Sequence, residues 1–215
     1  MALDTAAAIK HLRRADPVMR DLIKRVGACG LRPGARGDHF TTLLRAIVGQ
    51  QLSAKAAETI WLRLVALHPD GRKIAPEDVL AMDEQLMRGA GLSNAKVAYA
   101  KDLATHVVDG RLKLSRMGRL PDEEIVAELV AVNGIGRWTA EMFMMFRLGR
   151  PDVWAIGDLG LRNAASKLYG IEPTKANLEA VAEPWRPWRS VASWYLWRSL
   201  ALTAPSLGRE TKVPV

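Results

Sequence analysis

The sequence predicts an all-α fold of two helical lobes around a cleft. Apolar residues recur at helical spacing along nearly the whole chain. Alternating strand patterns joined by hairpin dipeptides are absent. The informative motifs are spread so evenly that they argue against a cut into two separate domains. We therefore expect one domain over residues 1–215, built from two interleaved helical subdomains.

The composition narrows the class of protein. Apolar residues make up 49% of the 215 and charged residues 25%, both ordinary for a globular chain. Lys and Arg number 31 against 23 Asp and Glu, and the pI is near 9.9. Such a surplus suits a polyanion such as nucleic acid or an anionic membrane surface. The lone Cys29 excludes an internal disulfide and a four-cysteine cluster.

The N-terminal stretch mixes charges into its apolar residues, which is atypical of a signal peptide. No run reaches the roughly 18 apolar residues of a spanning helix. These features predict an intracellular protein with no membrane contact.

The first half of the chain predicts three helices. The first covers Thr5–Val26 and leads into a loop rich in Gly and Pro at Arg32–Gly37. A second begins at Phe40 and is interrupted at Gly49-Gln50-Gln51. Ser53 then follows as a candidate N-cap of the third, whose apolar positions run to Val65.

The second half predicts five more helices. Pro121 lies where a first-turn proline is tolerated, and the acidic residues after it favour the positive end of a helix. Gly170 fits a helix stop. We expect both chain ends, Met1–Asp4 and Pro205–Val215, to fray. The five expected helices cover Asn94–Val108, Pro121–Ala131, Trp138–Arg147, Leu159–Leu168 and Arg186–Leu202.

The turn Asn133-Gly134-Ile135-Gly136 joins two expected helices and is the first candidate site. Two glycines permit positive φ and leave backbone N–H groups uncovered. Beside a helix N-terminus, such donors form an anion site of phosphate size. The pattern indicates a helix-hairpin-helix over about residues 122–147. Gly-x-Gly alone equally fits an ordinary turn between helices, but Trp138, Thr139 and the basic surplus favour the hairpin.

A second candidate site follows at Asp158. The stretch from Arg150 to Gly157 reads as a loop that delivers this carboxylate to the start of a helix. An Asp in this place is commonly an N-cap. A catalytic role is compatible with capping, because a helix N-terminus favours the ionised carboxylate that electrostatic catalysis requires.

The chain resembles the helix-hairpin-helix DNA glycosylase superfamily, and within it the 3-methyladenine DNA glycosylase II (AlkA) type. The matching segments run in family order from about residue 40 to residue 200. None is conclusive alone, but the ordered set is highly specific. They are Ala46–Ser53, Gly91-Leu92-Ser93-x-x-Lys96, Asn133–Ala140, Asp158 and Arg186–Ser190.

The resemblance implies a cleft that binds DNA and an essential carboxylate at Asp158. Cleavage of an N-glycosidic bond leaves an oxocarbenium-like sugar, which a nearby carboxylate stabilises. One carboxylate suffices when the leaving base is already cationic, as N-alkylated purines are. Glu141 is the nearest alternative acid and is expected to be a surface or salt-bridge residue.

The residue after Gly-Ile-Gly-Arg bears on the reaction type. Bifunctional relatives have a lysine there, which attacks the sugar. Trp138 cannot form a Schiff base, so the resemblance implies hydrolysis to an abasic site without lyase activity. No cofactor and no required metal are expected. Some relatives hold a monovalent cation at hairpin carbonyls, here those of Val130 and Val132.

Further roles follow from family positions. Trp138, Trp197 and Met142 are expected to line the base pocket, where indole stacks on an electron-deficient base. Core packing is the alternative for both tryptophans. Gln51 is the expected duplex wedge, with helix capping as its alternative. We expect the hairpin to bind DNA phosphates through Gly134, Gly136, Arg137 and Thr139.

Three positions depart from relatives. Some relatives carry leucine where Gln51 stands, so a polar wedge is a departure. Met142 replaces a pocket tyrosine of some relatives, which bears on base selectivity. Asn133 replaces the usual proline of the hairpin.

The expected function is therefore base excision repair of double-stranded DNA with damaged bases, by a monomer of the compact form in the cytoplasm, associated with the nucleoid. The lesion stays open among 3-methyladenine, 7-methylguanine, hypoxanthine, ethenoadenine, 1-methyladenine and 3-methylcytosine. A non-catalytic helix-hairpin-helix module that binds DNA is the alternative. A helix-turn-helix regulator is disfavoured, because the stretch from Trp138 to Arg147 is too apolar for a recognition helix.

Overall fold

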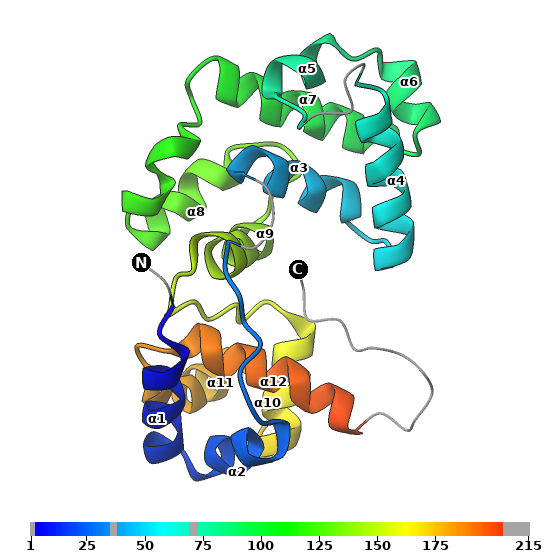
Figure 1. Cartoon of the computed structure of the whole chain (residues 1–215). Coiled ribbons are helices and arrows are strands. Elements are labelled where there is room, and N and C mark those ends of the chain that lie inside the picture. The colour runs from blue at the N-terminus through cyan, green and yellow to red at the C-terminus, as the bar shows by residue number, and fades with distance from the viewer. Residues whose placement is uncertain (1–2, 35–37, 69–72, 204–215) are drawn as a thin grey trace. The chain divides into compact units, whose positions relative to one another are not determined.

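A computed structural model describes residues 3–34, 38–68 and 73–203, and every regular element in that part of the chain is helical (Figure 1). The predicted all-α class is confirmed. The chain forms two compact units. We call Met1–Ala35 with Met144–Val215 the terminal unit, and Arg36–Phe143 the central unit.

The terminal unit is built from both ends of the chain. Its helix α12 packs against α1, α2 and α10, and α11 packs against α10. The core contains the fully buried side chains of Leu12, Met19, Trp185 and Tyr195. Its helices are α1 (Thr5–Ala15), α2 (Pro17–Val26), α10 (Leu159–Tyr169), α11 (Lys175–Ala182) and α12 (Arg189–Thr203).

The single helix expected over Thr5–Val26 is wrong, because the chain breaks at Asp16. Proline disfavours helical backbone in the residue before it, and Asp16 is extended at φ −145° and ψ 114°. Its Oδ1 caps α2 by accepting from the Met19 N–H at 3.0 Å. Its Oδ2 accepts from the Tyr169 hydroxyl at 2.6 Å and the Trp185 indole N–H at 2.7 Å. The break thus ties α2 to the core.

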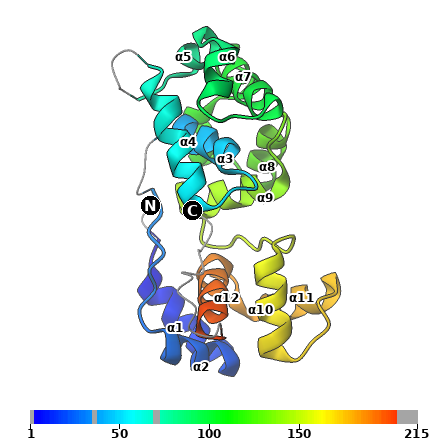
Figure 2. The same cartoon turned by 90° about the vertical axis from the view of Figure 1, so that its right-hand side faces the viewer.

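The central unit is organised around α7 (Asn94–Val108). Helices α3 (His39–Gly49), α5 (Pro76–Ala81) and α6 (Glu84–Gly89) all pack against it, and α4 (Ala54–Ala66) packs against α3 (Figure 2). A 3₁₀ segment at Leu114–Arg119 precedes the hairpin helices α8 (Asp122–Val130) and α9 (Arg137–Met142). Helix α7 therefore brings α3 together with the later helices α5 and α6.

The local signals for helix ends are confirmed where they were clear. The Ser53 hydroxyl accepts from the Ala56 N–H at 3.3 Å and caps α4, and Gly170 ends α10 at φ +64°. Helix α12 begins at Arg189 rather than Arg186, because Pro187 has no N–H and restricts the residue before it. Beyond α9, a π-helical turn occupies Phe143–Leu148, where an α-helix to Arg147 was expected.

Several short helical segments lie between the expected helices. The short segments α5, α6, α11 and Leu114–Arg119 were not expected. In the described residues, no helix is long and apolar enough to cross a membrane. Of the ends expected to fray, Met1, Ala2 and residues 205–215 lie outside the described residues, as do residues 35–37 of the expected loop.

Candidate active site

Asp158 begins α10, at the end of a loop through residues 149–157. Its Oδ1 accepts from the Leu161 N–H at 2.8 Å, so the predicted N-cap is confirmed. The same oxygen accepts from the Trp197 indole N–H at 3.0 Å. The residue is 9% exposed. Two donors on one oxygen fix the orientation of the carboxylate, which is what a positioned charge needs.

Trp197, which contacts this carboxylate, lies on α12. It is 4% exposed and stacks on Phe146, with ring centroids 5.8 Å apart. Gly160 makes the approach possible: a Cβ at this position would lie 3.0 Å from Asp158 Oδ1 and 3.3 Å from Trp197 Cδ1. The glycine therefore leaves room for the hydrogen bond between the two side chains.

The loop before Asp158 is held by the start of α12. The fully buried Ser190 hydroxyl donates to the Arg150 carbonyl at 2.6 Å and accepts from the Val153 N–H at 3.0 Å. Arg189 binds the Asp152 carboxylate through Nε at 2.8 Å and Nη2 at 2.9 Å. Such a forked pair fixes geometry as well as charge. The motif Arg186–Ser190, which had no assigned role in the sequence, thus fixes the loop that carries Asp158.

The hairpin lies in the central unit, between α8 and α9. Gly134 adopts φ +84°, and a Cβ there would lie 2.2 Å from Cδ2 of Tyr99. Gly136 is the N-cap of α9 at φ −92°, so only the first glycine uses positive φ. A Cβ on Gly136 would meet nothing within 4 Å. Gly136 therefore leaves its backbone open to an approaching group.

The polar residues of α9 differ in accessibility. Arg137 is exposed and binds the Glu123 carboxylate through Nη2 at 2.7 Å and Nη1 at 3.1 Å. Its Nε donates to Glu141 at 3.1 Å. Hydrogen bonding from the guanidinium lowers the pKa of Glu123. Glu141 is buried, so its expected surface position is wrong and its salt bridge is confirmed, while Thr139 is also buried.

The expected pocket residues have unequal exposure. Trp138, in the central unit, is 43% exposed, which contradicts a core position. Met142 and Trp197 are buried, so the core alternative describes Trp197 better. Among the three, Trp138 offers the accessible aromatic surface.

Gln51 lies in the turn between α3 and α4. It is exposed and adopts φ +58°, a left-handed conformation that is uncommon outside glycine. Gln50 and Ser53 occupy the adjoining cap positions, so Gln51 is not a cap. Leu52 beside it is also exposed.

The structure describes no cluster of His, Cys, Asp and Glu side chains that fits a metal ion within residues 3–34, 38–68 and 73–203. For a cation at the hairpin, the donors would be backbone carbonyls. The Val132 carbonyl accepts from the Ile135 N–H at 3.1 Å; a carbonyl has two lone pairs, so this bond leaves room for a cation. Val130 ends α8, where carbonyls lack intrahelical partners. A monovalent cation at these two carbonyls stays a prediction.

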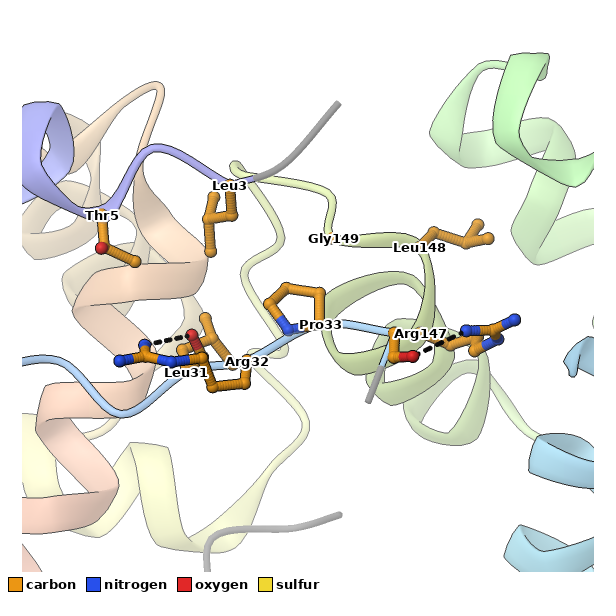
Figure 3. Close-up of a pocket in the computed structure, with 9 residues that line it drawn as sticks. Leu3, Thr5, Leu31, Arg32, Pro33, Arg147, Leu148 and Gly149 are labelled. Carbon is orange, nitrogen blue, oxygen red and sulfur yellow. Dashed lines mark hydrogen bonds between the residues drawn. The ribbon is translucent and has the colours of Figure 1, made fainter. Parts of the chain in front are cut away.

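The terminal unit contains a hollow with a lining of its own (Figure 3). Among its lining residues, Arg147 Nη1 donates to the Gly34 carbonyl at 3.3 Å, and Arg32 donates to the Leu31 carbonyl at 3.1 Å. None of the predicted site residues lines it, so it is not the candidate active site. Its walls are Leu3, Thr5, Leu31, Arg32, Pro33, Gly34, Arg147, Leu148 and Gly149.

Comparison with known proteins identifies the class. Residues 44–190 match the HhH-GPD superfamily of base excision DNA repair proteins. This segment covers most of the chain and contains the hairpin and Asp158. The chain belongs to this superfamily, and the resemblance to its AlkA type is confirmed.

Several relatives are named DNA-3-methyladenine glycosylases. DNA-3-methyladenine glycosylase 1 of Schizosaccharomyces pombe is 34% identical over 198 residues, covering 89% of this chain and 86% of the relative. The solved structure of that organism's Mag1 in complex with abasic DNA has a TM-score of 0.80 at 34% identity, covering 92% of this chain and 98% of that one. The solved structure of a DNA-3-methyladenine glycosidase from Bacillus halodurans has a TM-score of 0.83 at 33% identity, and the match covers 94% of each chain.

Proposed function

We propose that this chain hydrolyses the N-glycosidic bond of an alkylated base flipped out of double-stranded DNA and leaves an abasic site. The observation that carries the proposal is Asp158 at the start of α10, with Oδ1 held by Leu161 and Trp197. A carboxylate fixed in this way needs no reorganisation when positive charge develops on the sugar.

The chemistry follows from the charge of the substrate. When the C–N bond breaks, the bonding electrons leave with the alkylated base, which departs neutral. The sugar becomes an oxocarbenium-like cation, and Asp158 stabilises that charge. Water then adds to the anomeric carbon and loses a proton. Trp138 supplies no amine to attack the sugar, so the product keeps an intact strand.

DNA contacts are proposed for the hairpin and the wedge turn. The open backbone at Gly136, with Gly134, would approach a phosphate, and Arg137 would exchange Glu123 for it. Thr139 is buried, so we do not assign it the phosphate contact expected from the sequence. Trp138 would stack on the flipped base, with Met142 behind it and Trp197 orienting Asp158. Gln51 would fill the space that the base leaves. The protein would act as a monomer.

The test compares release of 7-methylguanine from a methylated duplex by wild type, Asp158→Asn and Glu141→Gln. Asparagine caps helices as well as aspartate, so Asp158→Asn should fold normally. Its rate should fall at least about 100-fold, by the magnitude known for removal of one preorganised charge-stabilising group, while duplex binding persists. Glu141→Gln, the matched loss of a buried acid, should keep the wild-type rate.

Two results would contradict the proposal. Release by Asp158→Asn at the wild-type rate would remove Asp158 from the chemistry. If the wild type releases no base from duplexes that carry any of the six candidate lesions, yet binds damaged and intact DNA equally, the non-catalytic binding module would be correct. Strand breaks without alkali treatment would contradict hydrolysis without lyase activity.

A further inference from the structure

Lys96 joins the turn of Gln51 to α7. Its Nζ donates to the Val48 carbonyl at 2.8 Å and to the Gln50 carbonyl at 2.8 Å. These oxygens lie at the C-terminal end of α3, where the helix dipole favours a cation. The ammonium group is partly buried, and this burial lowers its pKa. A long, flexible side chain has therefore been ordered on two specific backbone oxygens.

The same helix also holds the hairpin. Tyr99, one turn further along α7, packs its ring against Gly134, where no side chain would fit. Asp102 accepts the Asn133 N–H at 2.8 Å through its Oδ2. The proline found at this place in relatives has no such N–H, so the departure at Asn133 adds a tie to α7.

A third contact joins the turn and the hairpin directly. The Gln50 side chain donates from Nε2 to the Gly134 carbonyl at 2.7 Å. Gln50 therefore gives its carbonyl to Lys96 and its amide group to the hairpin. Next to it, Gln51 is held at φ +58°, a conformation that persists only where surrounding contacts determine it.

We propose that Lys96 is a positioning residue for base flipping, which fixes the Gln51 turn on α7 in register with the hairpin. Without its two hydrogen bonds the turn relaxes, and Gln51 no longer fills the space left by an extruded base. This inference rests on the proposed function and adds to it a residue that touches neither the sugar nor the base.

The test uses a matched control on the same helix. Lys101 Nζ also donates to two backbone carbonyls, those of Leu80 at 2.8 Å and Met82 at 2.6 Å, at the end of α5. Lys96→Met and Lys101→Met each remove two such bonds and keep most of the stem. Both variants should lose similar thermal stability, but only Lys96→Met should affect flipping.

Two duplexes separate flipping from chemistry under single-turnover conditions. In one, 7-methylguanine is paired with cytosine; in the other, it lies opposite a stable abasic analogue. Extruding a paired base costs the free energy of breaking its pair, whereas extruding an unpaired base costs less. Lys96→Met should release the paired lesion about 10- to 100-fold more slowly than wild type and the unpaired lesion at nearly the wild-type rate. Lys101→Met should match wild type on both.

The proposal is overturned if Lys96→Met equals Lys101→Met on the paired duplex, or if it is slowed equally on both duplexes. Gln51→Ala should show the same split, and combining it with Lys96→Met should add no further loss. If Lys96→Met does not fold, Lys96→Gln, which keeps one donor group, takes its place. It must slow release from the paired duplex more than from the unpaired one, by a smaller factor than expected for Lys96→Met. Asp158→Asn loses release on both duplexes, so failure of the proposed function gives a different pattern.

Discussion

Adding one methyl group at Gly160 tests how closely the Asp158 carboxylate must be placed. In Gly160→Ala the new Cβ would lie 3.0 Å from Asp158 Oδ1 and 3.3 Å from Trp197 Cδ1. Comfortable contacts between heavy atoms begin near about 3.5 Å. The two side chains must therefore move away from the new methyl group by about 0.2–0.5 Å.

The expected loss of activity follows from that displacement. A misplacement of about 1 Å can reduce an enzymatic rate about 100-fold. Scaled to 0.2–0.5 Å, the rate of base release should fall about 2.5- to 10-fold. Stability should change little, because alanine favours a helix over glycine by about 0.5–1 kcal/mol and this offsets part of the crowding.

The assay is single-turnover release of 7-methylguanine, with Gly157→Ala as the matched control. A Cβ at Gly157 would meet nothing within 4 Å, and its φ lies outside the left-handed region. Gly157→Ala should therefore keep the wild-type rate. If the two variants release base equally fast, the position of the carboxylate is not critical and the argument from Gly160 fails.

Three further predictions concern the supports of the site. Ser190→Ala removes the hydroxyl that bonds the Arg150 carbonyl and the Val153 N–H. The free energy of unfolding, measured in urea, should therefore fall by about 2–4 kcal/mol, and base release should slow. Unchanged stability would contradict the role of Ser190. In Gly134→Ala the backbone keeps a left-handed φ and the new Cβ would lie 2.2 Å from Tyr99, so the free energy of unfolding should fall by at least about 3 kcal/mol. In Gly136→Ala it should fall by about 1 kcal/mol or less. Equal losses in the two variants would refute this contrast. Burial, with the negative charge of ionised Cys29, raises the pKa of Tyr195 to about 12. The unfolded chain ionises first, near its ordinary pKa of about 10, so wild-type stability should fall as the pH rises from about 10 to 12. Tyr195→Phe should lack this component in unfolding curves.

The sequence was most informative where the structural cause is local. Asp158, Ser53 and Gly170 act on the backbone within a few residues of themselves, so their cap and stop roles were predictable. The break at Asp16 also had a local signal in the proline that follows it. Helices α5 and α6 had theirs in Pro76 and in Asp83, which accepts from the Gln85 N–H at 2.7 Å. These short helices lacked a full apolar period and were missed.

The remaining site contacts join residues far apart in the chain. The hydrogen bond from Trp197 to Asp158 spans 39 residues, and that from Lys96 to Val48 spans 48. Neither partner has a neighbour in sequence that indicates the other. The π-helical turn at Phe143–Leu148 is a shift in backbone register, which apolar periodicity does not distinguish from an α-helix. Family resemblance located the motifs, but packing alone assigned roles to Arg189 and Ser190.

The order in which the two units are synthesised determines when each can fold on the ribosome. Arg36–Phe143 is finished as one continuous stretch, whereas the other unit needs both Met1–Ala35 and Met144–Val215. Helices α1 and α2 are made before the whole of Arg36–Phe143, whereas α12, against which they pack, is made after it. The apolar side chains of Leu12, Met19 and Leu22 therefore cannot reach their full burial until α12 has been translated.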